Sequence, residues 1–116
     1  MSDASATIDL VHLARQSLGD RALETELLVM FERQAHQIID RLCEIPLHIG
    51  TGRAELAHAL AHTLKGSALA VGARRVASAA QDYENAVDGH NSDVQILALR
   101  IAVDEARRAV AHLLAA

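Results

Sequence analysis

The chain has 116 residues, a length typical of one domain, and a formal net charge of −4. Its 23 alanines and 16 leucines account for 39 residues, whereas aromatic residues make up 2% of the chain and proline occurs once. Because alanine and leucine favour helices and strand-forming residues are scarce, the composition predicts an all-α fold. The acidic balance excludes a basic surface for nucleic acid, and the lack of aromatic residues excludes a base-stacking platform.

Localisation signals are also missing from the sequence. The sequence has no window of about 18 unbroken apolar residues of the kind that spans a membrane, and the N-terminus lacks the basic and apolar pattern of a signal peptide. Cys43 is the single cysteine and cannot form an internal disulfide. Its apolar surroundings predict a buried structural thiol rather than a nucleophile. We therefore expect a cytoplasmic protein.

Turn-forming residues divide the chain into five amphipathic segments, each with apolar residues at steps of three and four. The turns are Gly19-Asp20, the run 46–52, Gly72 and the run 88–91. Short connections between long helices favour antiparallel neighbours. The expected fold is therefore an antiparallel four-helix bundle with a short additional N-terminal helix, formed by a single domain over 1–116 whose residues 1–7 are a tail.

The segments follow in chain order. The first, 8–18, is short and has Thr7 or Ser5 as its candidate N-cap. The second, 21–44, has the apolar stripe Leu23, Leu27, Met30 with Phe31, Ile38 and Leu42. The third, 53–71, is capped by Thr51 or Gly52 and has the stripe Leu56, Leu60, Leu64, Ala68 and Val71. The fourth, 73–87, has Val76, Ala80, Tyr83 and Val87, and the last, from Ser92, has Ile96, Leu99, Val103, Ala106, Val110 and Leu113.

The third segment carries polar residues on the face opposite its apolar stripe. His62 lies two residues after Leu60, which places it about 200° around the helix from that core position. Steps of four, three and four along the helix then group the residues of one exposed face, namely His58, His62, Lys65, Gly66 and Leu69.

Gly66 is unexpected within a helix, because glycine there costs about 1 kcal/mol relative to alanine. Two explanations are open. Another helix of the bundle approaches closely at this position, or an external molecule needs the space beside His62. The position of Gly66 on the exposed face favours the second explanation.

An imidazole beside an ammonium group is suited to carrying a phosphoryl group. An unprotonated imidazole is a nucleophile with a free nitrogen lone pair, and phosphoryl transfer requires in-line positioning and nearby cationic groups. His58 and His62 together supply only two metal ligands, fewer than a zinc site requires, so we expect no metal site. The chain has seven histidines, so spacing alone does not distinguish His62 from the others.

The local sequence does distinguish it. The run Ala61-His62-Thr63-Leu64-Lys65-Gly66, followed by Gly72, resembles the signature of histidine-containing phosphotransfer (HPt) domains, which is His, two residues, Lys-Gly, five residues and Gly. The resemblance extends over about residues 8–114. It implies a bundle of antiparallel helices, in agreement with the periodicity.

The resemblance also implies roles for individual residues. His62 would accept the phosphoryl group on Nε2, Lys65 would be the neighbouring cation, and Gly66 would leave room for the partner. Members of the family have a Gln or Glu 22 residues after the histidine, and here that residue is Glu84. A carboxylate that accepts from Nδ1–H would leave Nε2 free to attack. The chain departs from the family at Leu69, where a small residue is usual.

By the same resemblance, the partners would be receiver domains of a hybrid histidine kinase and of a response regulator. The receiver would supply Mg²⁺, and this chain would be a carrier rather than an enzyme, without a cofactor of its own. The candidate partner-binding residues are His58, Leu69, Val11, Arg74 and Arg75. We expect a monomer, because the histidine face must stay accessible. The alternative is a helical interaction or scaffold module that binds a partner without accepting phosphate.

Overall fold

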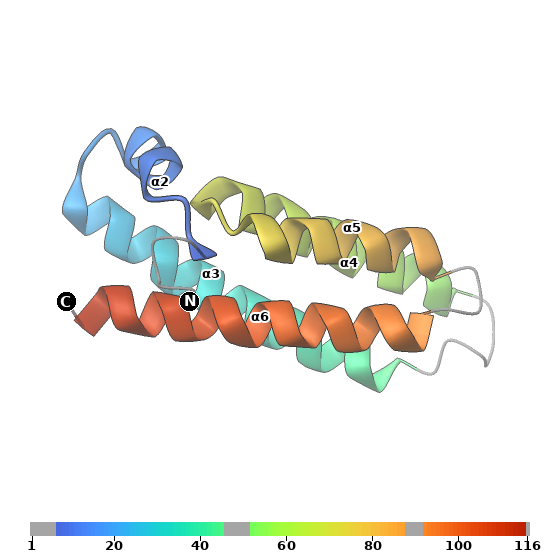
Figure 1. Cartoon of the computed structure of the whole chain (residues 1–116). Helices are drawn as coiled ribbons and strands as arrows, with labels where there is room; N and C mark the ends of the chain where they lie inside the picture. The colour runs from blue at the N-terminus through green and yellow to red at the C-terminus, as the bar shows by residue number, and fades with distance from the viewer. Residues whose placement is uncertain (1–6, 46–51, 88–91, 116) are drawn as a thin grey trace.

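The computed structural model describes residues 7–45, 52–87 and 92–115. Within these residues lie five α-helices, α2 (Leu10–Ser17), α3 (Arg21–Glu44), α4 (Arg53–Val71), α5 (Arg74–Ala86) and α6 (Ser92–Ala115). The four longer helices form an antiparallel bundle, and α2 lies at one end of it (Figure 1). The predicted all-α fold is therefore confirmed. The turn at 88–91, the candidate caps Ser5 and Thr51, and all of the turn at 46–52 except Gly52 lie outside the described residues.

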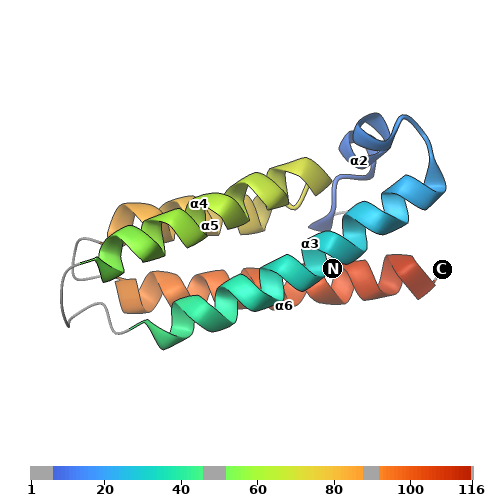
Figure 2. The same cartoon turned by 180° about the vertical axis from the view of Figure 1, so that it is seen from behind.

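The bundle is a four-sided ring in which α4 lies diagonally opposite α6. Helix α3 packs against α4 and α6, and α5 packs against the same two helices. Figures 1 and 2 show α5 and α6 on one side of the molecule and α3 and α4 on the other. A polar side-chain contact bridges each side of the ring, by Ser67 with Gln34, Lys65 with Gln81, Arg75 with Glu105 and Arg107 with Glu32.

The core contains many small residues, which allow the helices to approach closely. Alanine side chains occupy inner positions on each of the four long helices, including Ala35, Ala61, Ala80 and Ala106. The predicted stripes of α5 and α6 face this core, and Tyr83 is 1% exposed. Burial away from water raises the pKa of the Tyr83 hydroxyl above 10.0. No helix among the described residues is apolar enough over a sufficient length to cross a bilayer.

Three residues of the stripes predicted for α3 and α4 are exposed, and for these the prediction is wrong. Leu23, Met30 and Leu56 have exposed fractions of 37%, 65% and 41%. Each lies at the margin of an apolar stripe, where an adjacent or nearby residue such as Phe31 or Ala57 takes the buried position. An alanine at an inner position lets the neighbouring helix approach, so the larger leucine is not needed there.

Cys43 is exposed, contrary to the prediction of a buried thiol. It is the last residue but one of α3, beyond the buried Leu42. Partial loss of water around the sulfur raises the pKa of the thiol above 9.0, and the nearby carboxylates of Asp40 and Glu44 raise it further, against the opposing effect of Arg100. A raised pKa makes the thiol a poor nucleophile at neutral pH.

Helix α2 is attached to the turn between α4 and α5. Its N-cap is Asp9, whose Oδ1 accepts from the His12 backbone N–H at 3.1 Å, so the predicted cap at Thr7 or Ser5 is wrong. The backbone N–H of Asp9 donates to the Gly72 carbonyl at 3.0 Å, and Arg74 forms an ion pair with the Asp9 carboxylate at 2.6 Å. Gly72 has a φ of +77°, and a Cβ there would lie 2.8 Å from Cβ of Asp9. Only glycine therefore fits at this turn.

Candidate functional site

The candidate site is centred on His62 in the middle of α4. The buried residues Leu60, Ala61 and Leu64 fix the orientation of the helix and direct His62 outward. Its side chain is 75% exposed. The imidazole is thus presented to solvent by a rigid helix, as the sequence predicts.

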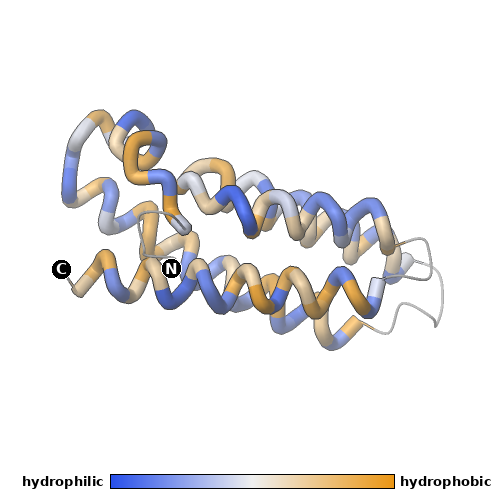
Figure 3. Tube along the Cα trace, viewed as in Figure 1, coloured by the Kyte–Doolittle hydropathy of each residue, from blue (hydrophilic) through white to orange (hydrophobic). Residues whose placement is uncertain are grey.

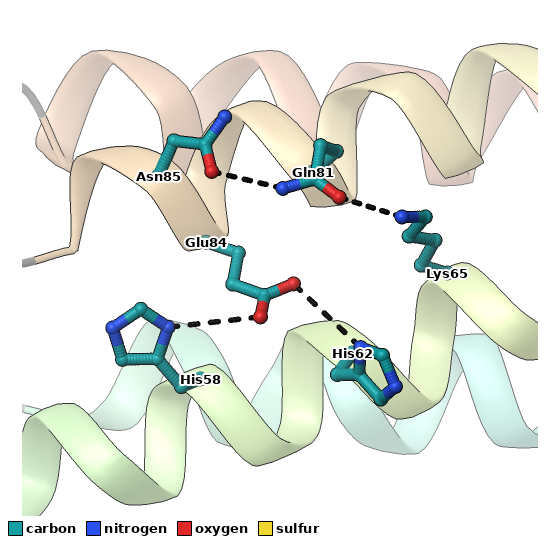
Figure 4. Close-up of polar contacts among 6 residues, drawn as sticks. All are labelled: His58, His62, Lys65, Gln81, Glu84 and Asn85. Atoms are coloured by element: carbon teal, nitrogen blue, oxygen red, sulfur yellow. Dashed lines mark hydrogen bonds and ion pairs between the residues drawn. The ribbon is translucent and has the colours of Figure 1, made fainter.

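Glu84 of α5 lies between two histidines of α4 (Figure 4). Its Oε1 is 3.9 Å from Nδ1 of His62, and its Oε2 is 3.8 Å from Nδ1 of His58. The Glu84 side chain is 22% exposed, and its Oε1 is buried without a hydrogen-bond partner. A buried carboxylate oxygen favours a nearby N–H donor, and the 3.9 Å gap to His62 closes with a small side-chain movement. Figure 4 shows the other ring nitrogen, Nε2, on the side of His62 away from Glu84.

Lys65 is held beside this pair by residues that the sequence did not single out. Its Nζ donates to Oε1 of Gln81 at 2.6 Å, and Nε2 of Gln81 donates to Oδ1 of Asn85 at 2.8 Å. Gln81 and Asn85 lie three residues before and one residue after Glu84, on the part of α5 that faces α4. The polar spacing 81, 84 and 85 is the signal that identifies this face. Gln81, itself bonded to Asn85, thus holds the Lys65 ammonium group on the side of the site where Glu84 meets His62 (Figure 4).

The space above Gly66 is open. A Cβ built on this residue would meet nothing within 4 Å, and the residue is exposed. The first explanation for this glycine, close approach of another helix of the same chain, is therefore wrong within the described part of the chain. The second explanation, space for an external molecule, stays a prediction.

The candidate partner-binding residues are spread over several elements. Leu69 is 47% exposed and lies on α4 two turns after His62, and Val11 is 64% exposed on α2. Arg74 is exposed but already paired with Asp9. Arg75 is paired with Glu105 at 2.5 Å and thus lies on the side of α5 that faces α6. Of these residues, Leu69 lies on the same helix as the histidine, and His58 contacts Glu84 directly.

The described residues contain no group of three or more His, Cys, Asp or Glu side chains arranged to hold a metal ion. The contacts described above assemble an exposed imidazole, a carboxylate directed at its Nδ1, and a positioned ammonium group. These features define the class of protein: a helical bundle that presents a histidine to solvent beside a carboxylate.

A comparison with protein families identifies this class. The Hpt domain family matches residues 26–115, which include α4, α5, α6 and most of α3. The chain belongs to the Hpt domain family. No curated protein matches the chain. Hpt domains are phosphotransfer carriers of two-component phosphorelays, interact with receiver domains, and are not kinases.

Proposed function

We propose that this protein relays a phosphoryl group between aspartates of two receiver domains, one in a hybrid histidine kinase and one in a response regulator, through phospho-His62. The main supporting observation is the position of Glu84, whose buried Oε1 faces Nδ1 of the exposed His62 at 3.9 Å. A proton held on Nδ1 by this carboxylate keeps the lone pair on Nε2, the nitrogen on the side away from Glu84.

The transfer is a substitution at phosphorus. The Nε2 lone pair of His62 attacks the phosphorus of an aspartyl phosphate, an N–P bond forms, and the P–O bond to the aspartate breaks. The bonding electrons leave with the aspartate as a carboxylate. Attack by a second aspartate reverses these changes. Glu84 stabilises the positive charge that develops on the ring, and Lys65 stabilises the phosphoryl oxygens.

Mg²⁺ belongs to the receiver in this proposal, and this chain contributes no cofactor. The receiver docks over the exposed face of α4, where Gly66 leaves space and Leu69 offers an apolar contact. Val11 and Arg74, near the turn at Gly72, extend this surface. The carrier function requires that His62 is accessible, and its 75% exposure supports this.

The test is transfer from a receiver domain that has been phosphorylated by its kinase with Mg²⁺ and radiolabelled ATP. The recipients are the wild type, His62→Gln and, as a matched control, His36→Gln, which removes another exposed histidine from α3. Acid-labile, base-stable label is expected on the wild type and on His36→Gln and not on His62→Gln. Circular dichroism of the variants confirms that the bundle is intact.

Two results would contradict the proposal. Label on His62→Gln would move the acceptor to another histidine, and His58 would be examined next. Absence of label from every form, with receiver binding still measurable by calorimetry, would favour the alternative of an interaction module. Glu84→Ala tests the role of the carboxylate, since it lowers the transfer rate while leaving His62 as the labelled residue.

A further inference from the structure

Helix α6 carries two heptad rows on opposite faces. The inner row packs in the core and contains Ile96, Leu99, Val103, Ala106, Val110 and Leu113. The outer row is displaced from it by two residues, or about 200° around the helix. Its members also alternate by steps of three and four, and all are exposed, namely Val94, Leu97, Ile101, Asp104, Arg108, Ala111 and Ala115.

The N-terminal half of this outer row is strongly apolar. Val94, Leu97 and Ile101 have exposed fractions of 66%, 57% and 60%. Figure 3 shows hydrophobic residues recurring along α6 between hydrophilic ones. An apolar row with a 3.5-residue repeat is the pattern by which two helices pair in a coiled coil. The inner row already packs in the core of the bundle, so core packing does not account for the apolar residues of the outer row.

We propose that the outer row of α6 binds a second copy of this chain, with the two α6 helices antiparallel about a twofold axis. The charges of the row are the reason for this choice of partner. Asp104 lies at the middle of α6 and Arg108 one turn later, and neither has an ion-pair partner within the described residues. In an antiparallel pair, Asp104 of each copy faces Arg108 of the other, so the contact forms twice.

The register set by these charges also pairs large side chains with small ones. Ile101 of one copy faces Ala111 of the other, and Leu97 faces Ala115. Opposed large and small residues allow two helices to approach closely along their length. The neighbouring antiparallel register, shifted by one heptad, places Leu97 against Arg108 and Ile101 against Asp104, which leaves the charges facing apolar groups. The register that pairs Asp104 of each copy with Arg108 of the other is therefore favoured over this one.

A hollow beside the outer row provides room for the second copy. It has a volume of about 440 Å³ and lies between α3 and the C-terminal half of α6. Val29 of α3 and Ala111 and Leu114 of α6 form part of its apolar wall, and Asp104 and Arg108 also line it. In the antiparallel pair this hollow lies near Leu97 of the other copy.

This association leaves the candidate site accessible. Helix α4 lies diagonally across the bundle from α6 (Figures 1 and 2). His62 is exposed on α4, so it lies away from the proposed contact. The expectation of a monomer depends on keeping the histidine accessible, and a dimer through α6 meets the same condition. The proposal does not depend on the phosphotransfer function.

The proposal is tested by sedimentation velocity over a series of concentrations. The wild type is compared with variants in which the charges at positions 104 and 108 are reversed or exchanged. The wild type is expected to form a dimer with increasing concentration. Asp104→Arg places two arginine pairs across the axis and should weaken the dimer at least about tenfold. The double variant Asp104→Arg/Arg108→Asp should restore it. Glu55→Arg, with the same change of net charge on the exposed face of α4, should leave it unchanged.

Three results would overturn the proposal. They are a wild type that stays monomeric at every concentration, a dimer that Asp104→Arg does not weaken, and a weakened dimer that the double exchange does not restore. All substituted residues are exposed, so the variants should fold, and circular dichroism verifies this.

Discussion

Substitution of Gly66 by alanine should stabilise the protein and impair its function at the same time. The residue lies in the interior of α4, where alanine is favoured over glycine by about 1 kcal/mol. The new Cβ would meet nothing within 4 Å, so no steric penalty opposes this gain. The free energy of unfolding should therefore rise by about 1 kcal/mol, and the melting temperature by about 4 °C for a chain of this size.

The phosphotransfer rate should change in the opposite direction. The methyl group would occupy the space above the helix beside His62, where the receiver must approach. A displacement of about 1 Å in the reacting groups lowers a rate by about 100-fold, so we expect a loss of at least tenfold. Urea denaturation measures the stability, and rapid-quench transfer from a phosphorylated receiver measures the rate.

Ala98→Gly is the matched control, because Ala98 is exposed in the interior of α6, away from the candidate site. It should lower the stability by about 1 kcal/mol and leave the transfer rate unchanged. A less stable Gly66→Ala would show that the position is more crowded than the structure indicates. A more stable Gly66→Ala with an unchanged transfer rate would refute the interpretation of Gly66 as space for the partner.

Two further predictions concern ionisable groups outside the candidate site. The pKa of Cys43 is raised above 9.0, so alkylation by iodoacetamide at neutral pH should be slower in the native protein than in urea, although the side chain is exposed. The alkylation rate of the native protein should reach half its maximum only above pH 9.0. Equal rates in the two states would contradict this. The pKa of Asp9 is lowered below 3.8 by the hydrogen bond from the His12 backbone N–H, with help from Arg74 and against the effect of desolvation. The charge on Asp9 therefore stabilises the fold above that pH, and this contribution disappears as the pH falls through the lowered pKa. Asp9→Asn should thus be less stable than the wild type at neutral pH, with a difference in urea midpoint that shrinks below pH 3.8, and a constant difference would contradict the assignment.

The sequence predicted the helices better than it predicted their inward faces. The ranges 21–44 and 53–71 agree with α3 and α4, because Asp20 and Gly72 mark clear helix ends. The inward face of α4 was predicted less well, since a periodic pattern does not show whether Leu56 or Ala57 packs inside. That choice depends on how closely the neighbouring helix approaches, which is a property of the whole bundle.

The candidate site shows a similar division. His62, Glu84 and Lys65 were predicted from spacing and resemblance, and the structure brings them together around two adjacent helices. Gln81 and Asn85 were missed because a polar residue on an amphipathic helix is most often a solvated one. The hydrogen bond from Lys65 to Gln81 depends on the relative placement of α4 and α5, which no local pattern determines.

The two glycines of the motif illustrate what the structure adds. In the sequence, Gly66 and Gly72 look equivalent, since both follow the histidine at fixed spacing. In the structure, Gly72 has a positive φ and is in close contact with Asp9, so the fold itself requires glycine at this position. Gly66 is in an ordinary helix with open space above it. No described residue of the chain therefore accounts for Gly66. We expect it to be the residue at which stability and partner binding impose opposite preferences.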